Sequence, residues 1–223
     1  MLEIQAHRGN SEPALRSLLG ASPTSVEIDV GVTADGAVVA SHEVRATTVE
    51  CLPSPLLGEP WRELSAVDAR ALGRLTLDEA LAIAGPTPVI VEAKSFPPHT
   101  ATPREFARAL QPYLSRISLC SFDKRVLTHA RRLHRSLETT FLFEVPVRVA
   151  TAARTLGPRA DLVTRDLVHA AHALEMRIVP WTVNDPREMR ALIDLGVDGI
   201  VTDEPALLYS VATRAAPQRL RAA

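Results

Sequence analysis

The sequence lacks a surplus of either charge, long apolar runs and any pattern among its cysteines. Its 25 basic and 26 acidic residues give a formal net charge of −1, so nothing electrostatic favours binding to nucleic acid. Its apolar stretches are too short to span a bilayer, and no basic amphipathic helix predicts a membrane-surface protein. The two cysteines, Cys51 and Cys120, lack metal-site spacing, and a disulfide between them has no positive support.

Lysine is also scarce, because the chain has 23 arginines but only Lys94 and Lys124. Since Lys94 stands beside an apolar run, this imbalance slightly favours a specific role for it. The first apolar run begins at Leu2, which leaves no room for a secretory signal in this sequence, so we expect a cytoplasmic protein. With 223 residues, 46% of them hydrophobic, the chain can bury one large core.

Strand-like and helical patterns alternate along the chain. Eight strands are expected, at Glu3–Ala6, Ser25–Val30, Pro88–Glu92, Ile117–Ser121, Thr139–Phe143, Ala160–Thr164, Arg177–Trp181 and Gly199–Thr202. Helices are expected at Pro13–Leu19, Thr76–Ala84, Pro103–Leu114, Lys124–Arg135, Val147–Leu156, Leu167–Glu175, Pro186–Leu195 and Ala206–Thr213. Prolines suit first turns at Pro103, Pro186 and Pro205, and glycines suit helix ends at Gly85, Gly157 and Gly196.

Eight strand–helix units in a chain of this length predict an α/β fold, a single-domain TIM (β/α)₈ barrel. A doubly wound open sheet is the rival, because it has the same alternation. The count of eight and the absence of a G-x-G-x-x-G motif after the first strand favour the barrel. We assign residues 1–216 to it, expect residues 217–223 to fray, and interpret Val44 to about Ala71 as a long loop over the barrel mouth.

Polar residues stand where four apolar runs end. They are His7 and Arg8, Glu27 and Asp29, His42, and Glu92 and Lys94. In a barrel, the carboxyl ends of the strands face one mouth, where the active site lies. We therefore expect these seven side chains to be neighbours in space.

Glu27 and Asp29 are two residues apart on one expected strand, so their side chains share a face. Glu92 brings a third carboxylate from the next parallel strand, and three such groups repel one another unless a cation intervenes. Ligation by oxygen alone suits one Mg²⁺ or Ca²⁺ rather than Zn²⁺. The alternative is that the carboxylates form ion pairs with Arg8 and Lys94.

The charges and histidines indicate a phosphodiester substrate. Three carboxylates, a divalent cation, Arg8 and Lys94 leave one surplus positive charge, which suits a monoanion that Arg8 and Lys94 can bind. Cleavage needs a base for the nucleophile and an acid for the leaving alcohol, and His7 and His42 can fill these roles. Trp181 is either a wall for the glycerol or alcohol moiety or an aromatic side chain that closes the barrel.

An ordered set of motifs resembles the glycerophosphodiester phosphodiesterase family over nearly the whole chain. The matching segments are Ala6-His7-Arg8-Gly9, Glu27-Ile28-Asp29-Val30, Thr33-Ala34-Asp35-Gly36, Val38-Val39-Ala40-Ser41-His42, Thr76-Leu77-Asp78-Glu79-Ala80-Leu81, Glu92-Ala93-Lys94, Ser121-Phe122, Trp181-Thr182-Val183-Asn184-Asp185 and Gly196-Val197-Asp198-Gly199-Ile200-Val201-Thr202-Asp203-Glu204-Pro205.

The resemblance implies a TIM barrel that holds Ca²⁺ or Mg²⁺ at Glu27, Asp29 and Glu92. It also implies an acid–base pair of His7 and His42, with Arg8 and Lys94 on the phosphate. Family members hydrolyse glycerophosphodiesters to glycerol 3-phosphate and an alcohol. The route proposed for them uses the substrate's neighbouring hydroxyl as first nucleophile and passes through a cyclic phosphate that water opens.

The chain departs from the family pattern at three places. Ser11-Glu12-Pro13-Ala14 replaces a Pro-Glu-Asn-Thr segment, with Glu12 as the candidate counterpart of its glutamate, and Glu43 replaces the usual aspartate. The short stretch from Glu43 to Leu75 leaves little room for the subdomain inserted in many members, so we expect a short or absent cap.

Three alternatives stay open. The same site could act on lysophospholipids, as a lysophospholipase D does, or the chain could be a barrel that binds phosphodiesters without cutting them. Lys94 could also form a Schiff base, although Glu92 on the same face would keep it protonated and disfavour this. The expected partner is a small-molecule glycerophosphodiester.

Overall fold

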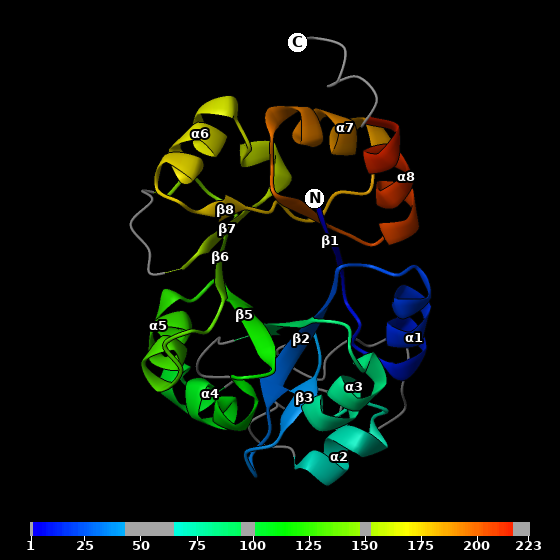
Figure 1. The fold of residues 1–223 in the computed structure, drawn as a ribbon. Coiled ribbons are helices and arrows are strands. Elements are labelled where there is room, and N and C mark those ends of the chain that lie inside the picture. The colour runs from blue at the N-terminus through cyan, green and yellow to red at the C-terminus, as the bar shows by residue number, and fades with distance from the viewer. Residues whose placement is uncertain (1, 43–64, 95–100, 148–152, 216–223) are drawn as a thin grey trace.

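The computed structural model describes residues 2–42, 65–94, 101–147 and 153–215, in which eight parallel strands form a barrel with helices outside it (Figure 1). The strand order is β8-β7-β6-β5-β4-β2-β1-β9. The strands are β1 (Glu3–Ala6), β2 (Ser25–Val32), β4 (Val89–Ala93), β5 (Ile117–Ser121), β6 (Thr139–Phe143), β7 (Thr155–Pro158), β8 (Arg177–Ile178) and β9 (Gly199–Thr202). The predicted TIM barrel is therefore confirmed.

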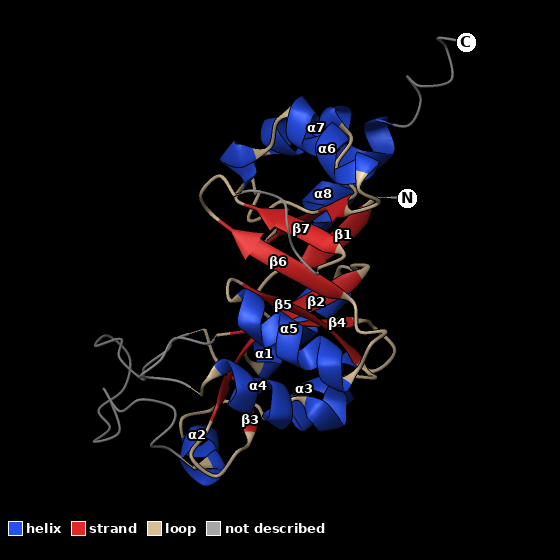
Figure 2. Cartoon of the chain, turned by 90° about the vertical axis from the view of Figure 1, so that its left-hand side faces the viewer, coloured by secondary structure: helices blue, strands red, loops and turns tan. Residues whose placement is uncertain are grey.

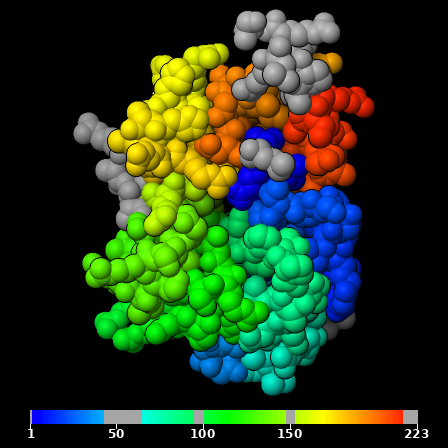
Figure 3. Space-filling view, in the orientation of Figure 1, coloured from blue at the N-terminus to red at the C-terminus, as the bar shows by residue number. Residues whose placement is uncertain are grey.

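The barrel is nearly closed by backbone hydrogen bonds beyond β8. Val201 N–H donates to the Pro180 carbonyl and Val183 N–H donates to the Val201 carbonyl, both at 2.9 Å. On its other side, β9 pairs with β1 through four residue pairs. The first and last strands of the chain are thus adjacent, and Figure 3 shows the blue start of the chain beside the orange and red end.

Helices flank the strands on both sides in the side view of Figure 2. They are α1 (Glu12–Gly20), α2 (Ala66–Ala71), α3 (Leu77–Ala84), α4 (Pro103–Ala109), α5 (Lys124–Leu133), α6 (Arg165–Ala173), α7 (Pro186–Leu195) and α8 (Pro205–Ala215), with 3₁₀ turns η2 (Gln111–Tyr113) and η3 (Ala160–Leu162). Within these described ranges, no helix has the length and apolarity needed to cross a membrane.

Local sequence explains where several helices begin and end. Thr76 and Thr102 cap α3 and α4 with their hydroxyls and form capping boxes with glutamates three residues later. The expected prolines open α4, α7 and α8. Gly196 ends α7 at φ 95°, a left-handed conformation that glycine adopts without strain.

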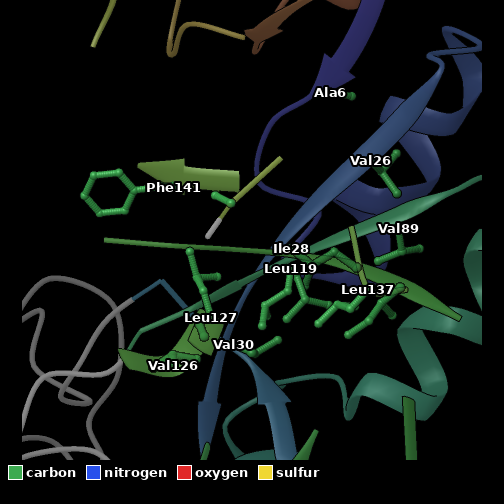
Figure 4. Packing of buried hydrophobic residues seen from close by; sticks show 14 of the residues in the cluster. Ala6, Val26, Ile28, Val30, Val89, Leu119, Val126, Leu127, Leu137 and Phe141 are labelled. Carbon is green, nitrogen blue, oxygen red and sulfur yellow. The ribbon is translucent and has the colours of Figure 1, made fainter. Parts of the chain in front are cut away.

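Alternation along β2 separates the core from the site. Val26, Ile28 and Val30 pack with the helices in the main apolar core (Figure 4), while Glu27, between two of them, lines the cavity inside the barrel. All eight residues of β2 are buried, so its carboxylates are held in a low-dielectric environment. Strand β3 (Val38–Ala40) pairs antiparallel with the end of β2 and leads to His42.

The sixth expected strand is wrong. The structure has β7 at Thr155–Pro158, and the expected strand Ala160–Thr164 instead begins with the 3₁₀ turn η3. The expected helix Val147–Leu156 is therefore wrong at its end, while residues 148–152 lie outside the description. Gly157 misled the prediction: it lies inside a strand, where a Cβ atom would be 2.6 Å from Leu142 Cδ2.

The stretch expected to be a long loop contains a helix, because Ser65 caps α2 and forms a capping box with Asp68. The rest of that stretch, with Glu43 and Cys51, lies in residues 43–64, outside the described ranges. The expected frayed tail, residues 217–223, is also outside them.

Candidate active site

Seven residues predicted from strand ends gather at one mouth, and all except Asp29 line a single cavity of about 240 Å³. Asp29 lies behind this lining, fully buried. Six strands contribute residues to the walls of the cavity, namely β1, β2, β4, β5, β6 and β9. Trp181, which the sequence also singled out, forms part of the wall.

His7 directly follows β1, and hydrogen bonds hold both its backbone and its imidazole ring. Its N–H donates to the Thr202 carbonyl at 2.9 Å, and its Nδ1 lies 2.8 Å from Asp203 Oδ1. Burial lowers the pKa of His7 below its ordinary value of 6.5, although Asp203 acts in the opposite direction. The imidazole is therefore largely neutral at pH 7.

Arg8 adopts a left-handed backbone conformation, with φ 62°, which is uncommon for a residue other than glycine. This turn directs its N–H toward Glu27 Oε2 at 2.9 Å. Its guanidinium Nη2 lies 2.7 Å from His42 Nε2. Arg8 thus joins the carboxylate side of the mouth to its second histidine.

Glu27, Asp29 and Glu92 form the predicted acidic group. One carboxylate oxygen from each lies within 4.8 Å of the others, and all three residues are buried. The parallel pairing of β2 with β4 sets Asp29 directly beside Glu92. This geometry suits the oxygen ligands that Mg²⁺ and Ca²⁺ prefer.

Lys94 lies between two of these carboxylates. Its Nζ is 2.8 Å from Asp29 Oδ1 and 2.6 Å from Glu92 Oε1. Burial would lower the pKa of Lys94, but the two carboxylates outweigh it and raise that pKa, so the ammonium form is favoured. The alternative of ion pairs is realised for Lys94, whereas the Arg8 guanidinium contacts His42 instead.

The three carboxylates differ in their affinity for protons. Burial and the neighbouring carboxylates raise the pKa of Glu27 well above its usual value. Burial also raises the pKa of Glu92, to about 7. Burial acts the same way on Asp29, but Lys94 and Asn10 outweigh it and lower the Asp29 pKa. One lysine therefore does not balance three carboxylates, and a further positive charge would be stabilised here.

Asn10 is a site residue that the sequence interpretation missed. Its amide Nδ2 donates to Asp29 Oδ2 at 2.7 Å, and its Oδ1 accepts from the Asp29 N–H at 2.9 Å. This pair of hydrogen bonds fixes the Asp29 carboxylate. Its proximity to His7 and Arg8 was the available signal, but its contact depends on the turn at Arg8.

Glu12 does not reach the site. It lies in the first turn of α1, exposed, and its Oε1 accepts from Arg16 Nε at 2.8 Å. The suggestion that Glu12 replaces the family's glutamate is therefore not supported by its contacts.

Trp181 is fixed as one wall of the cavity. Its Nε1 donates to the Gly157 carbonyl at 2.7 Å, and its ring packs edge-on against Phe122 with centroids 5.4 Å apart. Both aromatic rings pack on a small apolar cluster of Ile90, Cys120 and Leu142 inside the barrel. The wall at Trp181 is therefore apolar.

Asp203 and Asn184 belong to two of the family motifs and also lie at the site. Asp203 follows β9 and contacts His7, and Asn184 Nδ2 donates to Asp203 Oδ2 at 2.6 Å. The strand-end rule that selected His7 applies equally to Asp203 and would have found it.

Residues 7–207 match the model of the glycerophosphoryl diester phosphodiesterase family. A glycerophosphodiester phosphodiesterase of Caldanaerobacter subterraneus subsp. tengcongensis is 26% identical, over 95% of this chain and 98% of that protein.

Two solved structures share the fold. A crystal structure from Silicibacter pomeroyi DSS-3, named as a glycerophosphoryl diester phosphodiesterase, has a TM-score of 0.84 at 24% identity. The match covers 96% of this chain and 94% of that chain. An Oleispira antarctica phosphodiesterase, solved with its product sn-glycerol-3-phosphate, has a TM-score of 0.77 at 18% identity, covering 95% and 96%. With the family model matched across the barrel and its mouth, the chain belongs to the glycerophosphoryl diester phosphodiesterase family.

Proposed function

We propose that this enzyme hydrolyses small glycerophosphodiesters to glycerol 3-phosphate and an alcohol, with a divalent cation at Glu27, Asp29 and Glu92 and with His7 and His42 as its acid–base pair. The observation that carries the proposal is the meeting of three buried carboxylates with two histidines and two cations at one mouth. The product bound to the Oleispira antarctica relative supports the substrate class.

The residues present fit a divalent cation. Within the described part of the chain, Glu27 Oε1 is buried and has no hydrogen-bond partner, although such an atom is costly to leave unpaired. The donors are all carboxylate oxygens, which favours Mg²⁺ or Ca²⁺ over Zn²⁺. When bound, the cation would offset the carboxylate charge and polarise the phosphodiester.

The cationic side chains would bind the phosphodiester. The Arg8 guanidinium can donate two parallel hydrogen bonds to phosphate oxygens, and the Lys94 ammonium supplies a point charge. Because Asp29 and Glu92 hold Lys94 as an ammonium, it is unsuited to form a Schiff base, and we discard that alternative.

The two imidazoles would divide the proton transfers. One accepts the proton of the substrate's neighbouring hydroxyl as its oxygen bonds to phosphorus, and the other gives a proton to the alcohol as its bond to phosphorus breaks. Water then opens the cyclic phosphate, with the two imidazoles exchanging roles. The apolar wall at Trp181 would hold the glycerol or alcohol moiety.

The test is hydrolysis of glycerophosphocholine, measured as the release of glycerol 3-phosphate. EDTA should abolish turnover, and Mg²⁺ or Ca²⁺ should restore it. The variants His7→Ala and His42→Ala should each lower kcat by at least ~100-fold. His169→Ala, on an exposed part of α6, is the matched control and should keep full activity.

Substrate size is tested with the same protein. A cavity of about 240 Å³ between described residues favours a glycerophosphodiester over a lysophospholipid with its acyl chain. Faster release of alcohol from lysophosphatidylcholine than from glycerophosphocholine would contradict the proposed substrate. Tight binding of glycerophosphocholine without turnover, with either cation, would instead support the non-catalytic barrel.

A further inference from the structure

We propose that Asp203 is a positioning residue for His7, and that Asn184 in turn holds Asp203, so that His7 presents its Nε2 as the proton acceptor of the reaction. This inference rests on the proposed function, because it assigns one of the two proton-transfer roles. Asp203 would act through His7 and would not touch the substrate.

The contact between the two side chains has the geometry of a strong hydrogen bond. His7 Nδ1 and Asp203 Oδ1 are 2.8 Å apart, and 15% of the His7 side chain is exposed. The same imidazole lines the cavity of the site. One ring nitrogen is therefore bound to Asp203, and the opposite nitrogen remains for the cavity.

The chemistry of the partner decides the tautomer. An ionised carboxylate only accepts hydrogen bonds, so the proton of neutral His7 must be on Nδ1. Burial opposes ionisation of Asp203, but hydrogen bonds from Asn184 and His7 outweigh it and lower the Asp203 pKa. Nε2 then carries the lone pair that a general base needs.

Asn184 fixes the direction of the Asp203 carboxylate. Its Nδ2 donates to Asp203 Oδ2 at 2.6 Å, and its Oδ1 accepts from Asp203 N–H at 2.9 Å and from Thr202 Oγ1 at 3.0 Å. The amide is thus used at both ends, and each carboxylate oxygen of Asp203 has its own partner. Asp203 has little freedom to turn away from His7.

The three residues come from neighbouring parts of the barrel where its first and last strands meet. His7 follows β1, Asn184 lies beyond β8, and Asp203 follows β9. The His7 N–H also donates to the Thr202 carbonyl at 2.9 Å. The pairing of the backbone strands therefore positions these three short side chains.

The chain contains a second histidine–aspartate pair that serves as a control. His172 Nε2 lies 3.0 Å from Asp198 Oδ2, and Asp198 precedes β9 whereas Asp203 follows it. Neither His172 nor Asp198 lines the cavity. Loss of a carboxylate from this pair tests the general effect of removing such a contact.

The experiment uses the full chain with Mg²⁺ and glycerophosphocholine. In Asp203→Asn, the new amide can donate to Nδ1 and favour the other tautomer. We expect kcat to fall by about 10²–10⁴-fold, as when a triad aspartate becomes asparagine, while KM stays within about threefold. Asn184→Ala should lower kcat less than Asp203→Asn, and the control Asp198→Asn should leave it unchanged.

The tautomer itself is measured by ¹⁵N NMR of the imidazoles in the unmodified protein, with the His7 signals identified by their loss in His7→Gln. We expect a protonated Nδ1 and an unprotonated Nε2, and the reverse in Asp203→Asn. An unprotonated Nδ1 in the unmodified protein would overturn the inference, whether or not any variant folds. So would a kcat of Asp203→Asn within about threefold of the parent.

The two proposals fail in different ways. If the unmodified protein hydrolyses glycerophosphocholine but Asp203→Asn behaves like Asp198→Asn, the positioning role is wrong and the proposed function stands. If the unmodified protein shows no hydrolysis with Mg²⁺ or Ca²⁺, the proposed function is wrong, and the NMR measurement alone decides how Asp203 orients His7.

Discussion

At the scale of residues, the mouth of the barrel is defined by an imbalance of charge. Glu27, Asp29 and Glu92 lie together, and one buried ammonium, that of Lys94, forms ion pairs with Asp29 and Glu92. The pKa of Glu27 is raised well above its usual value by burial and by the other two carboxylates. Since a raised carboxyl pKa means that the ionised group destabilises the fold above its ordinary pKa, Glu27 weakens the metal-free protein at neutral pH.

Glu27→Gln should therefore stabilise the metal-free protein and inactivate it. At pH 7.5 in EDTA we expect a melting temperature higher by about 2–4 °C for each kcal/mol of relieved repulsion, measured by calorimetry. Hydrolysis and any stabilisation by Mg²⁺ should be lost. Glu138→Gln, which alters an exposed ion pair with Arg154, is the control. It should leave the melting temperature, the hydrolysis rate and the stabilisation by Mg²⁺ unchanged.

Asn10→Ala should weaken cation binding without removing a ligand, because the Asn10 amide fixes the Asp29 carboxylate by two hydrogen bonds. Loss of such a supporting contact costs about 10–100-fold in metal affinity. Titration calorimetry with Mg²⁺ or Ca²⁺ measures this. The neighbouring change Glu12→Gln should leave the affinity unaltered, and an equal loss there would contradict the role assigned to Asn10.

The pH dependence should reflect His7. Because burial lowers the pKa of His7 below 6.5, its neutral form persists to lower pH than in a free imidazole. As the proposed general base, His7 would be active when neutral, so the acid limb of kcat/KM should lie below pH 6.5. The pH–rate profile tests this: a limb centred above 6.5 would assign the acid limb to another group.

Most of these residues could be predicted from the sequence, for a geometric reason. His7, His42 and Lys94 lie just beyond β1, β3 and β4, and Glu27, Asp29 and Glu92 lie within β2 and β4 on a face that alternates with the core. The pairing of neighbouring strands in a parallel barrel brings these six residues to one mouth. Asn10 could not be found in this way, because its contact with Asp29 depends on the left-handed backbone at Arg8. That conformation has no pattern in the sequence.

At the scale of elements, strand periodicity located most of the barrel, and punctuation by glycine misplaced one strand. Gly157 was assigned to a helix end, whereas it lies in β7 because the Leu142 side chain needs the space beside it. A residue that is small for packing cannot be distinguished from one that ends a helix until the neighbouring strand is known. The prolines were clearer, since their fixed φ suits the first turn of a helix.

Gly199 is a second glycine selected for packing, and Gly199→Ala should destabilise β9. A Cβ atom there would lie 2.7 Å from Glu3 Cβ and 2.9 Å from the Glu3 carbonyl oxygen. We expect a loss of about 1–3 kcal/mol in the free energy of unfolding, as for other overpacked sites, measured in urea. Gly20→Ala has open space around it and should cost little, so equal losses would contradict the steric reason.

At the scale of the whole molecule, binding of a cation should couple to folding. The acidic group draws on two strands, β2 and β4, that are paired only in the folded barrel. A ligand that binds only the folded state adds about 2.7 kcal/mol at one hundred times its dissociation constant.

Adding Mg²⁺ or Ca²⁺ at that excess should therefore raise the melting temperature by about 5–10 °C for a chain of this length. Differential scanning calorimetry at constant ionic strength provides the measurement. An equal rise with KCl would indicate screening of charge and not binding. Glu27→Gln should show no rise with either divalent ion.

The adjacency of β1 and β9 places a limit on when activity can arise during synthesis. About two hundred residues of chain separate His7 from its partners Thr202 and Asp203, so their contacts can form only after β9 has been made. A nascent chain halted before Gly199 would own both imidazoles and all three carboxylates but lack the strand that completes the wall. The proposed catalysis therefore requires that every strand from β1 to β9 has been synthesised.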